Sequence, residues 1–382
     1  MKKFPFIAAG AAVAAVLCLS GCTAVDESVV NDSQTVYISP QFTQKKENHA
    51  LSTLTETEKK LYEKLLEAVN NFEEELVLEN VSDEQMKKLF KLLYTQENRI
   101  FWLDSRYTYN DSTGALSLIY RYPREEVDGM RAELEVAAGE ILGAIPAEAS
   151  DYEKIVAIHD AIVLKSEFSR SGTHSNSAYG ALVKGYAQCE GYAFAMAYLC
   201  SSAGIENYVV TGQNADGDSH AWNKILADGS WYNADCAWDD PILAREGDGY
   251  IRHDYLFLSD SEINGISHFI DNSLFEAIPC TATDNNFFRK EQLYCHTASE
   301  GIEMVEKLAK QAASERKTEI EIRFSNFTGY AEAASSLFDG GELKKIMEKL
   351  NSGFGYKVAS AHKTENDDLF IIHISLVYES ES

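Results

Sequence analysis

Positive charge is scarce in this chain of 382 residues. It has 34 Lys and Arg against 60 Asp and Glu, and its formal net charge is −26. Nucleic-acid binding requires cationic side chains that neutralise phosphates, so this balance argues against a nucleic-acid partner and against a basic patch for anionic lipids. We interpret the acidic surface as a feature that keeps the protein soluble, and it says little about the substrate.

Several other features that would define a fold or a site are missing. No sequence repeat of fixed period is visible, which argues against a solenoid. There is no Cys-x-x-Cys pair, so a zinc ribbon or a thioredoxin-type motif has no support. No motif indicates a bound metal or a cofactor. The length fits two or three domains, because a domain usually takes about 100 to 200 residues.

The N-terminus has the pattern of a targeting segment. Lys2 and Lys3 form a short positive region, and an apolar run rich in Ala and Val follows over residues 4–19. A membrane-spanning helix needs about 20 apolar residues, so this run is too short to predict a span. The pattern therefore predicts a signal peptide over residues 1–21.

The end of this run, Leu19-Ser20-Gly21-Cys22, resembles the bacterial lipobox, in which small residues precede a cysteine that is lipidated and becomes the new N-terminus. The resemblance implies a lipid on Cys22 and a lipoprotein anchored in the cell membrane, facing outside the cytoplasm. Removal of the signal peptide would delete two lysines and make the net charge −28. The polar residues 22–49 then form a predicted flexible tether.

Five cysteines remain once Cys18 and Cys22 are set aside, namely Cys189, Cys200, Cys236, Cys280 and Cys295. An odd number outside the cytoplasm means that at least one thiol stays free or pairs with another chain. Cys280 and Cys295 are close enough in sequence to form a disulfide, but the sequence leaves this open.

The N-terminal region, residues 50–146, is predicted to mix helix and strand. The spacing of apolar residues predicts helices over 51–78, 82–97 and 124–142 and a β-hairpin over 101–122. Ser82 and Gln85 form a capping box that starts the second of these helices.

The C-terminal region, residues 265–382, is predicted to be a small α/β domain. We expect helices over 298–314 and 331–350, and strands over 318–324, 356–360 and 369–378. It contains no motif that indicates a function. Between the two regions, an apolar face that starts at Asp151 predicts the first helix of a central core.

Cys189 lies where glycines loosen the chain just before a predicted helix. Residues 185–193 are Gly-Tyr-Ala-Gln-Cys-Glu-Gly-Tyr-Ala, and helical spacing continues to a stop at Gly204. At the start of a helix, unpaired backbone N–H groups favour a thiolate and can stabilise an oxyanion. The alternative is that Cys189 is a small buried residue, as most free cysteines are and as we expect for Cys200.

A predicted hairpin can bring a histidine and an aspartate together. Strands over 219–226 and 231–235 are joined at Asp228-Gly229, so positions whose numbers sum to about 457 lie opposite each other. His220 then has Asp235 as a near diagonal neighbour on the same face. A carboxylate beside an imidazole fixes its tautomer and stabilises its charged form. Alternatively, His220 is an ordinary core or surface histidine.

Together these segments resemble the transglutaminase-like superfamily over about residues 150–262. The matching motifs are Gly-x-x-x-Cys-x-Gly-Tyr-Ala, His-Ala-Trp-Asn, Trp-Tyr-x-x-Asp and Trp-Asp-Asp-Pro, at 185–193, 220–223, 231–235 and 238–241. The resemblance implies an α+β papain/transglutaminase-like core over residues 147–264. In that core a helix carrying the cysteine packs on an antiparallel sheet carrying the histidine and the aspartate.

The same resemblance assigns roles to individual residues. It implies that Cys189 is the nucleophile, that His220 is the general base and acid, and that Asp235 orients His220. Tyr179 and Gln188 are candidate donors to an oxyanion.

Asp239 and Asp240 are weaker candidates for the role of Asp235, and Cys236 is not a candidate. Cys236 departs from the family pattern, in which this position is often Thr or Val. Because it is adjacent to Asp235 on a predicted strand, its side chain would face away from the site. Asp239 and Asp240 are interpreted as carboxylates at a strand end and in a turn.

The resemblance implies a catalytic triad and thioester chemistry, in which a thiolate attacks an amide and a second nucleophile resolves the acyl-enzyme. We favour a cysteine protease or amidase acting on surface protein or cell-wall peptide. An amine-accepting transglutaminase and a silent peptide-binding module of the same fold are the alternatives. A zinc site built from Cys189, Cys236 and His220 is disfavoured because these residues lack paired spacing. The oligomeric state is left open.

Overall fold

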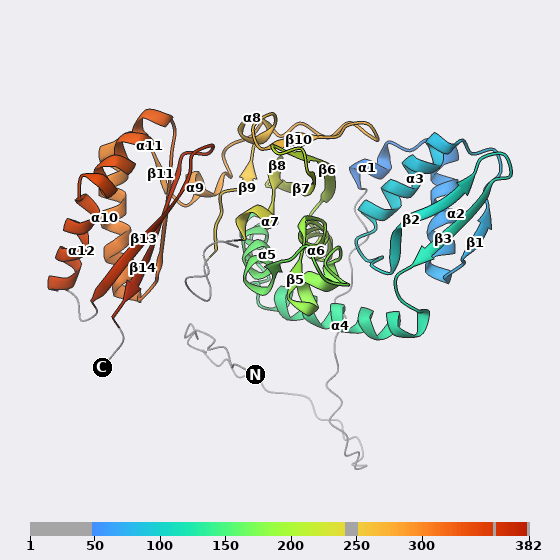
Figure 1. Cartoon of the computed structure of the whole chain (residues 1–382), viewed down its shortest axis with the longest axis horizontal. Coiled ribbons are helices and arrows are strands. Elements are labelled where there is room, and N and C mark those ends of the chain that lie inside the picture. Colours follow the sequence, from blue (N-terminus) through green and yellow to red (C-terminus); the bar gives the residue numbers. More distant parts are fainter. Residues whose placement is uncertain (1–47, 241–250, 354–356, 380–382) are drawn as a thin grey trace, which may run out of the picture. The chain divides into compact units, whose positions relative to one another are not determined.

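The computed structural model of the chain describes residues 48–240, 251–353 and 357–379 (Figure 1). The predicted signal peptide, Cys22 and nearly all of the predicted tether lie outside this part of the chain. Among the residues that are described, no helix combines the length and the apolar character needed to cross a membrane. The mixture of helices with mainly antiparallel sheets confirms the predicted α+β class.

The N-terminal region is a three-stranded sheet, ordered β1-β3-β2, with helices beside it. Its elements are α1 (His49–Ser52), α2 (Glu56–Asn71), β1 (Glu75–Val77), α3 (Asp83–Gln96), β2 (Leu103–Asn110), β3 (Ala115–Tyr120) and α4 (Arg124–Gly143). The capping box of Ser82 and Gln85 starts α3, and β2 and β3 form the predicted hairpin. Both predictions are therefore confirmed.

The single helix predicted over 51–78 is wrong. Thr55 starts a new helix, because its hydroxyl accepts a hydrogen bond from the N–H of Glu58, whose carboxylate accepts one from the N–H of Thr55. Phe72 has a left-handed backbone, with φ 58°, and ends α2. Residues 75–77 then join the sheet as β1. Local caps thus divide one apolar pattern into a helix pair and a strand.

The central region is built around α6, which packs on β6 and β7. Its elements are α5 (Asp151–Lys165), β4 (Glu167–Phe168), η1 (Gly180–Lys184), β5 (Tyr186–Ala187), α6 (Cys189–Ser202), β6 (Asn207–Asn214), β7 (Ser219–Ala227), β8 (Ser230–Ala234), α7 (Cys236–Asp239), β9 (Leu256–Leu258), α8 (Asp260–Ile263) and β10 (His268–Ile270). Every residue of α6 from Gly191 to Cys200 is buried, so the helix forms the centre of the core. The predicted helix-on-sheet arrangement is confirmed.

The central sheet is antiparallel throughout and has the order β10-β6-β7-β8-β9. Asp228 and Gly229 have positive φ angles of 50° and 84°, as the tight turn between β7 and β8 requires. Asn223 lies opposite Ala234, which confirms the predicted register. The sheet also contains β10, which lies beyond residue 264, where the sequence placed the end of the core domain.

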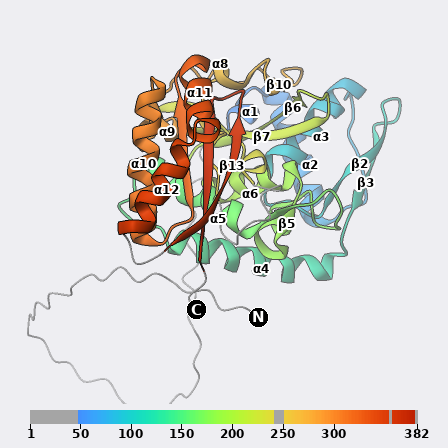
Figure 2. The same cartoon turned by 60° about the vertical axis from the view of Figure 1, so that its left-hand side comes forward.

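The C-terminal region is a four-stranded sheet, ordered β11-β12-β14-β13, with helices on one face (Figures 1 and 2). Its elements are α9 (Phe287–Lys290), β11 (Tyr294–Cys295), α10 (Ala298–Glu315), β12 (Glu319–Phe324), α11 (Phe327–Ala334), η2 (Ser335–Asp339), α12 (Glu342–Gly353), β13 (Val358–Asn366) and β14 (Ile371–Tyr378). The helix predicted over 331–350 is interrupted. Gly341 has a left-handed backbone, with φ 76°, so the backbone changes direction before α12 begins.

The two faces of this sheet differ in chemistry. Ile320 and Ile322 of β12 lie in the apolar cluster beneath the helices. Glu321 and Arg323 alternate with them and point to the other face, where Arg323 pairs with Glu262 of α8 at 2.8 Å. The C-terminal sheet therefore meets the central region through charged side chains.

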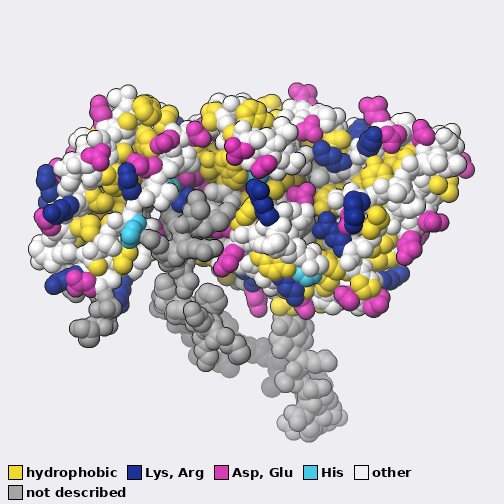
Figure 3. All heavy atoms as spheres, in the orientation of Figure 1, with side chains coloured by type: hydrophobic (Ala, Val, Ile, Leu, Met, Phe, Trp, Pro, Cys, Tyr) yellow, Lys and Arg dark blue, Asp and Glu magenta, His cyan; other side chains and the backbone are white. Residues whose placement is uncertain are grey.

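On the face drawn in Figure 3, Asp and Glu side chains are spread among Lys and Arg. The five cysteines within the described ranges are all free thiols, and Cys280 and Cys295 do not form a disulfide.

Candidate active site

Cys189 is the first residue of α6, as the sequence predicted. Gln188 precedes it in an extended conformation, so the N–H groups of the first turn have no partner inside the helix. A Cβ on Gly191 would lie 2.4 Å from the carbonyl oxygen of Ser175, so only glycine permits this close packing. The thiol itself is partly exposed, whereas most of the helix behind it is buried.

His220 and Asp235 form a buried pair beside this thiol. His220 Nε2 lies 2.5 Å from Asp235 Oδ2. Cys189 and His220 line the same pocket, and Asp235 occupies Nε2, so Nδ1 is the nitrogen left for the thiol. The structure therefore brings together the three residues to which the sequence assigned catalysis.

Asp235 is held in place because it also caps a helix. Its Oδ1 accepts hydrogen bonds from the N–H groups of Ala237, at 3.0 Å, and Trp238, at 3.3 Å, at the start of α7. This fixes the plane of the carboxylate and leaves Oδ2 to face His220.

The electrostatics of the pair favour a charged imidazole. Burial by itself lowers the pKa of His220, but the charge and hydrogen bond of Asp235, with the contact to Cys189, raise it to about 10. Burial by itself raises the pKa of Asp235, but His220 and His268 hold it well below its usual range. At neutral pH His220 is thus an imidazolium that lies between Cys189 and the carboxylate of Asp235.

His268 is a third partner that the sequence did not single out. Its Nε2 lies 3.0 Å from Asp235 Oδ2, and its Nδ1 lies 2.8 Å from the hydroxyl of Ser267. The side chain is fully buried and packs edge-on against Trp222, with ring centroids 4.8 Å apart. It lies on β10, beyond the predicted domain end, and no motif surrounds it, so only the pairing of β10 with β6 reveals it.

A pocket of about 290 Å³ opens directly onto the reacting groups. It is lined by Phe168, Arg170, Gln188, Cys189, Asn214, Asp218, Ser219, His220 and Trp238. Gln188 lines this pocket, and its role as an oxyanion donor stays a prediction. Tyr179 is not part of the lining, and its hydroxyl donates a hydrogen bond to Glu133 at 2.5 Å.

The weaker candidates near Asp235 lie elsewhere. Cys236 does not continue a strand but starts α7, where burial raises the pKa of its thiol. Asp239 ends that helix and faces His159 at 3.0 Å. Asp240 accepts hydrogen bonds from the hydroxyl of Tyr192 and the N–H of Phe168. The interpretation of Asp239 as a strand-end residue is wrong, because residues 236–239 are helical, whereas Asp240 follows the helix in a bend.

His220, Asp235 and His268 also form a group whose donor atoms lie close enough to surround a metal ion. Their remaining contacts point to another role. Cys189 and the Ser267 hydroxyl occupy the distal sides of the two imidazoles, and Asp235 Oδ1 accepts two backbone N–H groups. A thiol on one ring and a hydroxyl on the other can exchange protons with the imidazoles, which suits proton transfer.

Comparison with known proteins identifies the central region. Residues 142–236 match the sequence model of the transglutaminase-like superfamily, and this segment contains Cys189, His220 and Asp235. The chain thus carries a domain of the transglutaminase-like superfamily, as the motifs predicted. No curated protein matches the chain in a sequence search.

Several solved structures are similar to part of this chain. One is a proposed cysteine protease from Cytophaga hutchinsonii, which is 18% identical in sequence. The match covers 41% of this chain and 56% of that chain, with a TM-score of 0.25. A TGase structure has 13% identity, coverage of 42% and 50%, and a TM-score of 0.26. The periplasmic domain of TgpA from Pseudomonas aeruginosa has 21% identity, coverage of 30% and 44%, and a TM-score of 0.22. The chain therefore spans about half of the length of these proteins, and the scores add no argument about activity.

Proposed function

We propose that the protein is a cysteine hydrolase, a protease or amidase that cleaves protein or cell-wall peptide through an acyl-enzyme on Cys189. One observation carries the proposal. A partly exposed thiol at a helix start and a buried His220–Asp235 pair line the same pocket. This is the arrangement that nucleophilic catalysis by cysteine requires.

The first half of the reaction forms a thioester. The proton of Cys189 passes to His220, the sulfur attacks the carbonyl carbon of an amide, and negative charge develops on the carbonyl oxygen. In this proposal the N–H groups of the first turn of α6 and the amide of Gln188 donate hydrogen bonds to that charge. The C–N bond then breaks as the imidazolium of His220 gives its proton to the leaving amine.

The second half restores the enzyme. Water attacks the thioester carbon and gives a proton to His220, and the S–C bond breaks to release an acid and the thiolate. Asp235 keeps Nε2 protonated through both halves, so Nδ1 faces the reacting atoms. An amine in place of water would give a transamidation product by the same route.

We also propose that the protein is held on the membrane, outside the cytoplasm, by a lipid on Cys22. The lipobox-like residues 19–22 after an apolar run support this. In a bacterial host, Cys22→Ala is expected to move the protein from the membrane fraction to the soluble fraction. Unchanged fractionation would contradict the anchor.

The proposed activity is tested by offering the purified protein a casein mixture with and without a fluorescent primary amine. New fragments that are absent with Cys189→Ala would support hydrolysis. Dye incorporated into protein would make it a transglutaminase. Neither product, with both proteins folded by circular dichroism, would favour the silent binding module.

A further inference from the structure

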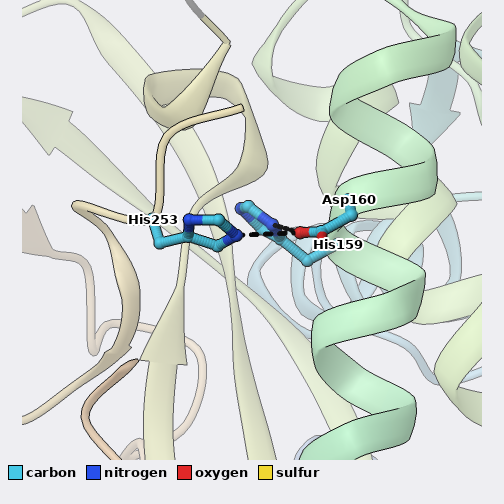
Figure 4. Close-up of side chains that lie close together, drawn as sticks. All are labelled: His159, Asp160 and His253. Carbon is cyan, nitrogen blue, oxygen red and sulfur yellow. Dashed lines mark hydrogen bonds and ion pairs between the residues drawn. The ribbon is translucent and has the colours of Figure 1, made fainter. Parts of the chain in front are cut away.

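A second group of histidines and carboxylates lies away from the pocket. His159 and Asp160 come from α5, and His253 comes from the segment before β9; Figure 4 shows the three side chains pointing toward one another. Asp160 Oδ1 lies 3.0 Å from His159 Nδ1 and 3.0 Å from His253 Nε2. The three donor atoms all lie within 4.8 Å of one another.

The outer nitrogens of both imidazoles face further carboxylates. His159 Nε2 lies 3.0 Å from Asp239 Oδ2, and His253 Nδ1 lies 2.6 Å from Glu321 Oε1. When these outer N–H groups donate hydrogen bonds to the carboxylates, the inner nitrogens carry lone pairs. Two lone pairs and a carboxylate oxygen then converge on one point, and they repel one another unless positive charge lies between them.

We propose that His159, Asp160 and His253 bind one divalent transition-metal ion, with Zn²⁺ as its representative. Two imidazole nitrogens and one carboxylate oxygen are a ligand set that such ions take in proteins. Histidines that bind a metal usually donate their other N–H to a carboxylate, which fixes the tautomer and the ring orientation. Asp239 and Glu321 provide this contact for the two rings.

The surroundings of the two rings carry negative charge that an ion would offset. The centroids of the His159 and His253 rings are 5.4 Å apart, and carboxylates face both nitrogens of each ring, so one divalent ion could supply the positive charge that ring protons supply without it. The ring of His253 is stacked on Phe287 at 3.7 Å, which limits its rotation. His159 is fully buried, while the Asp160 side chain is 31% exposed and leaves a side open for a water ligand.

The site would tie separate parts of the fold together. Its ligands come from α5 and the segment before β9, and Glu321, which orients His253, lies on β12 of the C-terminal sheet. The ion would thus fasten the C-terminal sheet to the central region. This role does not depend on any reaction at Cys189.

Metal binding is measured on the Cys189→Ala protein, in which the active-site thiol cannot act as a ligand. After chelator treatment and addition of Zn²⁺ at micromolar concentration, we expect one retained ion per chain by mass spectrometry of the metal and a higher midpoint of thermal unfolding. Glu321→Gln, which keeps the shape of the side chain, is expected to weaken Zn²⁺ binding about 10- to 100-fold. Asp160→Asn is expected to abolish retention.

A spectroscopic measurement covers the case in which the ligand variants fail to fold. Co²⁺ added to the Cys189→Ala protein is expected to give the visible d–d bands of a site with nitrogen and oxygen ligands. No retained Zn²⁺ and no Co²⁺ bands with the folded Cys189→Ala protein would overturn the proposal. It would also be overturned if folded Asp160→Asn bound Zn²⁺ as tightly as its parent.

Discussion

Two clusters of side chains in this protein have the same arrangement, in which a single aspartate oxygen lies between two imidazoles. Asp235 lies between His220 and His268, and Asp160 lies between His159 and His253. The clusters differ in what the outer nitrogens meet. A thiol and a hydroxyl face those of the first cluster, whereas two carboxylates face those of the second.

This difference separates two uses of the same residue types. A thiol and a hydroxyl can pass a proton to and from the imidazoles of the first cluster, and a pocket gives a substrate access to it. The carboxylates of the second cluster accumulate negative charge that a cation can offset. The outer partners of a histidine therefore tell more about its role than the histidine and its first carboxylate do.

The largest effect is expected for the thiol that only the first cluster contains. Cys189→Ala should lower kcat/KM on a cleaved peptide by about 10⁴-fold or more, because no other group can form the acyl-enzyme. The measurement is a peptide-cleavage rate, with circular dichroism as the control for folding. A residual activity near that of the unchanged protein would exclude Cys189 as the nucleophile.

The two shared aspartates should respond differently to the same change. Asp235→Asn should lower kcat/KM by about 10²- to 10⁴-fold, because the amide N–H₂ favours the wrong tautomer of His220 while the amide oxygen can still cap α7. Asp160→Asn is the matched control and should leave kcat nearly unchanged at temperatures where it is folded. Equal losses in the two variants would contradict the separation of roles.

The next largest effect is expected for the rates at which the thiols are alkylated. At pH 6, iodoacetamide should label Cys189 about 100-fold faster than Cys200 or Cys236, because burial raises the pKa of both of these thiols and hides them. Mass spectrometry of digested protein gives the rates. Slow labelling at all three positions would show that Cys189 is not activated.

A smaller effect is expected for the second histidine of the first cluster. His268→Phe should lower kcat about tenfold and shift the pH dependence of the rate, because the ring keeps its packing against Trp222 but loses the hydrogen bond to Asp235. Ser267→Ala, which leaves that bond intact, is the control. A loss of stability with an unchanged pH profile would give His268 a structural role alone.

The smallest effect is expected for the pH dependence of the unfolding free energy. The pKa of His220 is about 10 in the folded protein and about 6.5 when unfolded, so its protonation stabilises the fold fully below about pH 6.5 and loses this effect as the pH rises toward 10. The difference in unfolding free energy between the protein and His220→Gln should therefore shrink from pH 6 to pH 10. Urea unfolding at several pH values measures it, and a constant difference would contradict the raised pKa.

Local sequence signals were sufficient to place most of the first cluster. The glycines before Cys189 and the Asp228-Gly229 turn determine a helix start and a hairpin register by contacts within a few residues, and both predictions hold. The end of β8 was less predictable, because Asp235 leaves the strand to cap α7. Cys236 stays out of the pocket as predicted, but it does so as the first residue of α7 and not as part of a strand.

The remaining partners depend on contacts between distant segments. His268 reaches Asp235 only because β10 adds to the edge of the sheet at β6, and His253 lies 93 positions from Asp160 in the chain. No local pattern marks either histidine, since single histidines occur in many environments. The broken helices at Thr55 and Gly341 show the same limit on a smaller scale, because a cap or a left-handed residue outweighs a continuous apolar pattern.

Asp235 has two tasks, since one oxygen begins α7 and the other orients His220. A homologue that had lost catalytic activity would still need an aspartate or a similar capping residue at this position to fold correctly. The presence of Asp235 is therefore poor evidence that a related chain is active. Cys189, whose partly exposed thiol holds no backbone in place, is the residue that would disappear first and the better marker of an enzyme.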